Sequence, residues 1–161
     1  MSIVKLKLGC DIHLLQAKPP NLYDTLRLKY LESIPSLLLQ HPPEARIKRA
    51  PFAAHYGGSS QHFLQYTTSN RNPSGNYKRN MVFPQPDPNP VLPVLPGEPG
   101  LIFASRHELA NQAAWSLFVK HDPGVAVWTY LGEYKGEVCG KLTPDQFKAL
   151  SDKVINQVIC Y

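Results

Sequence analysis

The clearest structural signal in this 161-residue chain lies in residues 115–131, which read WSLFVKHDPGVAVWTYL. Aromatic and β-branched side chains dominate both ends of this stretch, at 115–120 and at 125–131, as is typical of strands. Between them, Pro123 and Gly124 occupy the two central positions of a type II turn, and the second of these positions requires positive φ. The stretch therefore predicts an antiparallel hairpin with Gly124 in the left-handed region.

Short elements on both sides of the hairpin complete a small α+β unit. The apolar runs predict a small antiparallel sheet with strands at 101–104, 115–120, 125–131 and 133–139. A capping-box pattern, in which Ser or Thr is followed three residues later by Glu or Gln, begins at Ser105 and again at Thr143. These patterns predict a short helix over 106–112 and a C-terminal helix over 144–158 that packs on the sheet.

The N-terminal half is less regular. Lysines alternate with aliphatic side chains over residues 2–9, which predicts one strand. Asn21 precedes apolar side chains at four-residue spacing and Asp24 follows three residues later, so a capped helix is predicted over 22–34. Seven prolines within residues 84–99 exclude a helix or a central strand there. That segment is therefore predicted to run as an extended strap.

Charge divides the chain at the end of this Pro-rich segment. The net charge is +5, from 17 basic and 12 acidic side chains, and the whole excess lies in the first hundred residues. We divide the chain into a basic, Pro-rich N-terminal region, 1–99, and a compact α+β core, 100–161, which together form one folding unit. No acidic residue occurs between Glu44 and Asp87. Such clustering favours a polyanionic or acidic partner, with a solvated basic loop as the simpler alternative.

Aromatic side chains are interleaved with the cations of this acid-free stretch. A surface that offers stacking faces together with phosphate-pairing cations is typical of proteins that bind single-stranded nucleic acid. The candidate binding residues are Arg46, Lys48, Arg49, Tyr56, Tyr66, Arg71, Tyr77, Lys78 and Arg79. The alternative is that the aromatic side chains attach an irregular segment to the core.

Residues able to perform acid–base chemistry are scattered along the chain. The alternative to a binding module is an enzyme or effector with a site near Arg106, His107, Trp128, Tyr130 and Glu133. Cys10 and His13 have the spacing of metal ligands, but zinc requires about four ligands and no second Cys/His pair supports them. The sequence therefore predicts no catalytic residue, no metal and no cofactor.

Composition also indicates where the protein resides. No apolar run approaches the roughly 20 residues that a membrane-spanning helix requires. Lysines interrupt the first apolar stretch, unlike the layout of a signal peptide. The three cysteines, Cys10, Cys139 and Cys160, are too few and too scattered for a disulfide framework. We therefore expect an intracellular protein, nuclear or cytoplasmic, in a reducing compartment.

Ordered motifs in the second half resemble a fungal domain family of unknown function. The matching segments are Asn89-Pro90, Pro96-Gly97-Glu98-Pro99-Gly100-Leu101, Trp128-Thr129-Tyr130-Leu131-Gly132-Glu133-Tyr134 and Leu142-Thr143-Pro144-Asp145-Gln146-Phe147. They fall within roughly residues 80–155, about half of the chain. Phe147 stands where the family has tryptophan. The resemblance implies a small folded module and supplies no catalytic residues.

These features together predict a non-enzymatic binding or scaffolding module. Its expected partner is a protein or a nucleic acid, contacted through residues 46–79. Binding to nucleic acid is expected to be weak and sensitive to salt, because few cations are available to pair with phosphates. No membrane is expected to take part.

Overall fold

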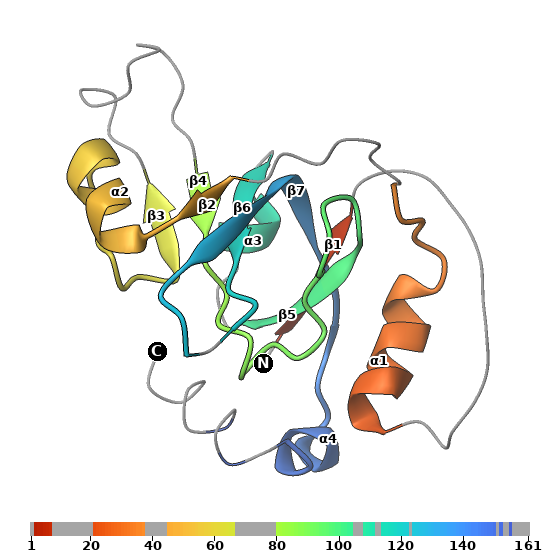
Figure 1. The fold of residues 1–161 in the computed structure, drawn as a ribbon. Helices are drawn as coiled ribbons and strands as arrows, with labels where there is room; N and C mark the ends of the chain where they lie inside the picture. Colours follow the sequence, from red (N-terminus) through yellow and green to blue (C-terminus); the bar gives the residue numbers. More distant parts are fainter. Residues whose placement is uncertain are drawn as a thin grey trace.

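A seven-stranded mixed sheet lies at the centre of the computed structural model, in the order β3-β4-β6-β7-β1-β5, with β2 beside β7 (Figure 1). The structure describes residues 2–7, 21–37, 45–66, 80–104, 108–111, 114–122, 124–150, 152 and 155. The strands in these ranges are β1 Ser2–Lys7, β2 Arg46–Ile47, β3 Leu64–Tyr66, β4 Asn80–Val82, β5 Gly100–Ala104, β6 Trp115–Val119 and β7 Trp128–Lys141. The helices in the same ranges are α1 Leu22–Leu31, α2 Arg49–Tyr56, α3 Glu108–Asn111 and α4 Pro144–Lys148. Figure 1 shows α1 and α2 at opposite ends of the sheet.

The predicted α+β class is confirmed, but the sheet is larger than predicted and is not purely antiparallel. β4 pairs with β6 in parallel, whereas the other pairs among the described strands are antiparallel. β1 lies between β7 and β5, so the first strand of the chain is inside the sheet. β2, β3 and β4 have only two or three residues each, which is too short for a periodic pattern to be recognised in the sequence.

The hairpin of β6 and β7 is present, but its turn is not of the predicted type. The Val125 amide donates to the Asp122 carbonyl at 3.1 Å, which closes a turn at the predicted place. Gly124 does not adopt positive φ, so the prediction of a type II turn is wrong. The reason is local: Asp122 Oδ1 accepts from the Gly124 amide at 2.8 Å, and this Asx-type contact makes a turn without left-handed backbone. β7 then begins only at Trp128, three residues later than predicted.

β7 is one long strand where the sequence predicts two. Gly132 lies inside it, at a φ of 115°, rather than in a break between strands. The register with β6 shifts between Leu117, opposite Gly132, and Phe118, opposite Tyr130, so Leu131 is an extra residue. This irregularity is a β-bulge, in which glycine tolerates the unusual backbone and the strand continues beyond it.

The predicted helix starts at Asn21 and Thr143 are confirmed together with their capping boxes. Asn21 Oδ1 accepts from the Asp24 amide at 2.9 Å, and the Asp24 carboxylate accepts from the Asn21 amide at 3.3 Å. Thr143 and Gln146 form the same reciprocal pair at the start of α4.

α1 ends at Leu31, three residues before the predicted end at 34 and four before Pro35. The prediction of one continuous helix over 144–158 is wrong at its middle, because α4 ends at Lys148 and Ala149 and Leu150 are not helical. Most of the predicted helix beyond residue 150 lies outside the described residues.

Three clusters of buried side chains connect the described elements. The first joins β3, β4, β5, β6, β7 and α3, and it includes Trp115 and Tyr134, which are opposite each other in the sheet. The second joins α1 to β5, with Leu26 and Phe103 among its members. The third, called the aromatic cluster below, contains Met81, Phe83, Phe118 and Trp128, with Ile47, Phe52 and Tyr130 packed against it. α2 therefore attaches to the sheet mainly through aromatic side chains.

The Pro-rich strap, residues 84–99, runs without helix or strand, as predicted. It follows the outer edge of β5. There the Leu101 amide donates to the Val91 carbonyl at 2.8 Å. The Phe103 amide donates to Oδ1 of the buried Asn89, also at 2.8 Å. The strap therefore satisfies backbone groups that an edge strand would otherwise expose.

The end of the strap is joined to the sheet through Tyr134. The Gly97 amide donates to the Tyr134 hydroxyl at 3.2 Å, and the Gly97 carbonyl accepts from the Leu37 amide at 3.0 Å. Glu98 Oε2 accepts from two amides of the loop that precedes it, at 2.8 and 2.9 Å. The glycine and the glutamate of the Pro-Gly-x-Pro-Gly-Leu motif thus shape the strap and connect it to β7.

This joint makes a testable prediction for alkaline pH. Burial raises the pKa of Tyr134 to about 12 from an ordinary value of 10.0, and the charge of Glu98 acts in the same direction, against the hydrogen bond from Gly97. The pKa of Tyr134 is higher in the folded than in the unfolded protein. The contribution of the neutral phenol to folding stability is therefore complete below about pH 10 and is lost as the pH rises toward about 12. The loss is on the order of 2 kcal/mol.

Tyr134→Phe isolates this effect from the titration of the other tyrosines and lysines. At neutral pH the variant is less stable than the natural protein by about 1 kcal/mol, because the Gly97 amide loses its acceptor. The gap in urea-unfolding free energy should shrink or reverse between about pH 10 and about pH 12, since only the natural protein then ionises a buried phenol. A gap that stays constant across this range would contradict the burial of Tyr134 at the joint.

Candidate functional site

The predicted basic surface begins at β2, where outward and inward side chains alternate. Arg46 pairs with Thr129 of β7 and is exposed, as is Lys48. Ile47 pairs with Trp128 and packs against the aromatic cluster. Because side chains of extended backbone alternate between two sides, Arg46 and Lys48 point away from the aromatic cluster on the same side of the segment.

Arg49, the third cation of this segment, belongs to the core and not to the surface. Its side chain is only 7% exposed. The guanidinium carbon lies 4.1 Å from the centre of the Phe83 ring and 5.4 Å from that of Trp128. Nη2 donates to the carbonyl oxygens of Ser59 and His62. Arg49 is therefore removed from the predicted basic surface, and it connects α2, the following loop and the aromatic cluster.

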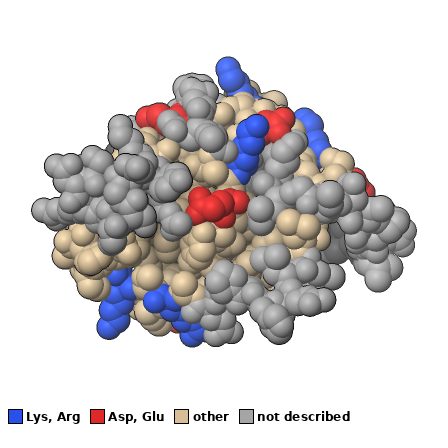
Figure 2. Space-filling view, turned by 90° about the horizontal axis from the view of Figure 1, so that it is seen from above, with Lys and Arg blue, Asp and Glu red and all other residues tan. Residues whose placement is uncertain are grey.

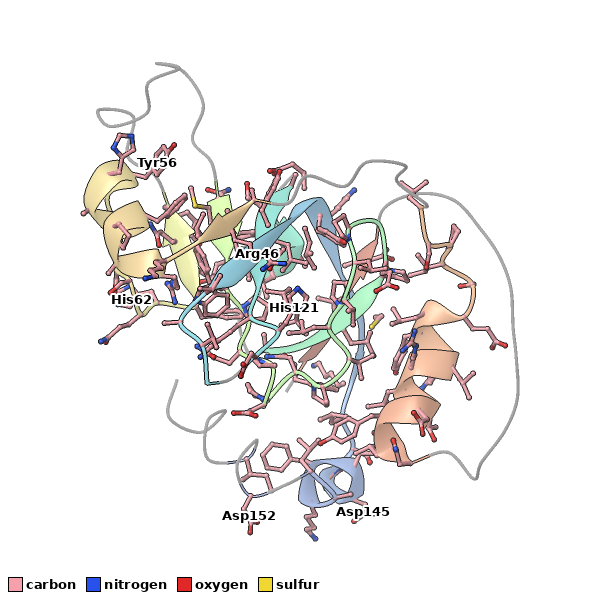
Figure 3. All side chains as sticks on the ribbon, in the orientation of Figure 1. Arg46, Tyr56, His62, His121, Asp145 and Asp152 are labelled. Atoms are coloured by element: carbon pink, nitrogen blue, oxygen red, sulfur yellow. The ribbon has the colours of Figure 1, made fainter. Side chains whose placement is uncertain are left out.

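The aromatic candidates lie in different places. Tyr56 is half-buried at the end of α2, where its ring centre is 4.7 Å from that of Phe52. Tyr66 is 47% exposed and packs against Trp115 with ring centres 5.8 Å apart. Figure 3 places Arg46 over the middle of the sheet and Tyr56 at the outer end of α2, so these two do not form one contiguous patch. The other four candidates, Arg71, Tyr77, Lys78 and Arg79, lie outside the described residues.

The charged side chains of the described residues do not form one large basic patch on the face shown in Figure 2. Lys and Arg side chains lie there in separate places, with Asp and Glu side chains between them.

The alternative site is brought together only in part. Arg106 and His107 lie outside the described residues. Trp128 is 4% exposed and its ring meets Phe83 edge-on, so it is a core residue. Tyr130 and Glu133, however, do lie together, because the Tyr130 hydroxyl donates to Glu133 Oε1 at 2.7 Å.

Ser116 joins this pair and was missed by the sequence analysis. Its hydroxyl donates to the same Glu133 Oε1 at 2.6 Å, from the neighbouring strand β6. A serine becomes a nucleophile when an adjacent general base can take its proton. Here, however, Ser116 is only 2% exposed, so a substrate cannot reach its oxygen. The arrangement orients the carboxylate of Glu133 and does not activate the serine for attack on an external group.

Neither a metal centre nor a membrane span is found in the part of the chain that the structure describes. The described ranges hold no group of three His, Cys, Asp or Glu side chains placed to bind a metal ion. Cys10 and His13 lie outside these ranges. None of the described helices combines the length and the apolar character needed to cross a membrane.

The motifs that resemble a known family have structural roles, because their residues join the strap to the sheet and shape β7. Asn89 and Gly97 attach the strap, Gly132 forms the bulge of β7, and Tyr134 links the two. Comparison with curated proteins and with solved structures gave no match. One family model matches residues 46–160, which include α2, the strap, β6 and β7. The chain belongs to this family, which is described as a domain of unknown function, DUF6697.

Proposed function

We propose that this chain is a non-enzymatic binding module whose exposed cations at β2 contact single-stranded nucleic acid weakly. The observation that carries the proposal is the alternation at residues 46–49, which leaves Arg46 and Lys48 exposed while Ile47 and Arg49 are directed into the molecule. Phosphate oxygens are the natural acceptors for exposed lysine and arginine side chains.

The rigid attachment of this segment supports a binding role. β2 pairs with β7, and the Tyr130 amide donates to the Ala45 carbonyl at 2.9 Å immediately before β2. Arg49 then holds the next turn of chain in the core through two hydrogen bonds. A backbone that is already ordered loses little conformational entropy on binding.

The surroundings favour an anionic partner. Residues 45–66, all described, contain no acidic side chain. Tyr66 on β3, which β4, β6 and β7 separate from β2 in the sheet, offers a second, separate ring that is 47% exposed, and aromatic faces of this kind stack on unpaired bases. Arg71, Tyr77, Lys78 and Arg79 follow Tyr66 in the sequence and would add cations and a ring to that second contact.

An enzyme is supported less well. Of the alternative site, Tyr130 and Glu133 lie together, but the adjacent Ser116 is buried and Trp128 is part of the core. A reactive site requires a nucleophile or base that a substrate can approach. The binding module is therefore the better-supported function.

The test is a fluorescence-anisotropy titration of a labelled single-stranded oligothymidylate with the full chain at low salt. We expect Arg46→Gln combined with Lys48→Gln to weaken binding roughly tenfold, because two phosphate contacts are lost. Lys135→Gln combined with Lys141→Gln is the matched control. These two lysines are exposed on β7, in the half of the chain whose charges cancel, and their removal should leave the affinity unchanged.

The other outcomes distinguish the partners. If the oligonucleotide does not bind while polyglutamate binds and is sensitive to the same double variant, the partner is an acidic protein segment. If neither polyanion binds at low salt, the basic segment has no role in binding and the proposal fails.

A further inference from the structure

The carboxylate of Glu133, at the centre of β7, accepts two hydrogen bonds and has no charged partner among the described residues. Glu133 is exposed. Its Oε1 accepts hydrogen bonds from the hydroxyls of Ser116, at 2.6 Å, and Tyr130, at 2.7 Å. Hydrogen bonds to an ionised carboxylate are strong and orient it. Among the described residues, no donor reaches Oε2 and no cation pairs with Glu133.

The orientation has a consequence for the second oxygen. Two donors use the acceptor capacity of Oε1, because a carboxylate oxygen has two lone pairs. Ser116 is fixed in the core at 2% exposure, so it holds Oε1 toward the sheet. Oε2, on the same rigid group, is then the oxygen that an external donor meets.

The side chains around the Glu133 carboxylate indicate which kind of ligand it can bind. The half-exposed Tyr130 ring lies beside the carboxylate, and its other contacts include Phe118, with ring centres 5.2 Å apart. Lys135, the next residue on the same side of β7, is one strand repeat away, about 7 Å along the strand. A negative charge next to an aromatic face selects a cation that can both donate hydrogen bonds and stack.

We propose that Glu133 and Tyr130 form a binding seat for the guanidinium group of an arginine side chain on a protein partner. Guanidinium is planar, carries several N–H donors and is weakly hydrated, so it stacks on aromatic rings and pairs with carboxylates more readily than ammonium does. The seat is independent of the proposed nucleic-acid contact, because it uses an acidic group and different residues.

The experiment uses the full ¹⁵N-labelled chain and N-acetyl-arginine amide as the probe, with the neutral citrulline analogue and N-acetyl-lysine amide for comparison. We expect saturable amide shift changes centred on residues 116–118 of β6 and 130–133 of β7. The arginine probe should bind at least about fivefold more tightly than either comparison compound, which corresponds to one strong charge-assisted contact.

Two variants separate the seat from a structural effect. Glu133→Gln keeps an oxygen that can accept from both hydroxyls, so the fold is preserved while arginine loses its advantage over citrulline. Tyr130→Phe keeps the ring and removes one orienting hydroxyl, so binding weakens about two- to threefold. Glu137→Gln, on the same side of β7, is the matched control and should leave binding unchanged.

Four results would overturn the seat: equal binding of arginine and citrulline, equal binding of arginine and lysine, shift changes that centre elsewhere, or a Glu133→Gln variant that retains the preference for arginine. The double variant Arg46→Gln, Lys48→Gln should bind the arginine probe normally, so failure of the nucleic-acid proposal and failure of the seat are told apart.

Discussion

Arg49→Met should lower the free energy of unfolding by about 3 kcal/mol. The guanidinium donates two charge-assisted hydrogen bonds, to the carbonyls of Ser59 and His62, and it stacks on Phe83 at 4.1 Å. Methionine fills a similar volume but donates nothing, so both carbonyls lose their donor and the loop after α2 loses its attachment. Urea unfolding followed by tryptophan fluorescence measures the effect, since Trp128 is part of the same cluster.

Two comparison variants make this result specific. Arg49→Lys keeps the charge but lacks the planar fork, so it should recover only part of the loss. Arg46→Met changes an exposed arginine three positions earlier and should stay within about 0.5 kcal/mol of the natural protein. If Arg49→Met changed the free energy of unfolding as little as Arg46→Met, Arg49 would be a surface cation. The hydrogen bonds of a buried Arg49 to Ser59 and His62 would then be ruled out.

Gly97→Ala should also cost about 3 kcal/mol. Gly97 has a φ of 94°, where a side chain is strained, and a Cβ at this position would lie 2.1 Å from the Leu37 carbonyl oxygen. That oxygen is backbone, so relief requires the strap to move away from the chain after α1. The same movement would weaken the hydrogen bond from the Gly97 amide to Tyr134.

Gly132→Ala is the matched control, because it measures the cost of placing a side chain at positive φ without a steric collision. Gly132 has a φ of 115°, but a Cβ there would have nothing within 4 Å. We expect it to cost only about 1–2 kcal/mol, from conformational strain without collision. Differential scanning calorimetry of both variants gives the comparison, and equal losses would show that the contact between Gly97 and Leu37 has no energetic weight.

The sequence predicted those elements that carry their own local signals. The capping boxes at Asn21 and Thr143 and the β-rich stretches around the hairpin act within a few residues, so they were recognised. The turn at Gly124 was assigned the wrong type because an Asp side chain supplied a competing hydrogen bond. The sequence predicts a break at Gly132, because only the pairing of β6 with β7 shows that the strand continues through a bulge.

The candidate site depended on tertiary contacts and was predicted less completely. Arg46, Lys48 and Arg49 are all basic, so residue type alone does not distinguish a buried from an exposed cation. Only the packing of α2 on the aromatic cluster decides that Arg49 is buried. The closeness of Tyr130 and Glu133 follows from their three-residue spacing across a bulge. Ser116 carries no motif, and only the register of β6 with β7 places it opposite Glu133.

The motif residues and the exposed cations of this domain have different surroundings. The glycines, prolines and Asn89 of the family-like motifs hold the strap and the sheet together. Arg46 and Lys48 are exposed on that scaffold, and the proposed function assigns them to binding. The proposed function thus predicts that changes in the motifs alter stability, whereas changes in the exposed cations alter affinity alone.

The salt dependence of oligothymidylate binding tests the central claim most directly. Each phosphate neutralised on a single strand contributes a slope of about −0.7 to the logarithm of the association constant against the logarithm of salt concentration. If Arg46 and Lys48 each neutralise one phosphate, the slope of the natural protein should be steeper than that of the Arg46→Gln, Lys48→Gln variant by about 1.4. Equal slopes for the two proteins, whatever their affinities, would contradict a phosphate contact at β2.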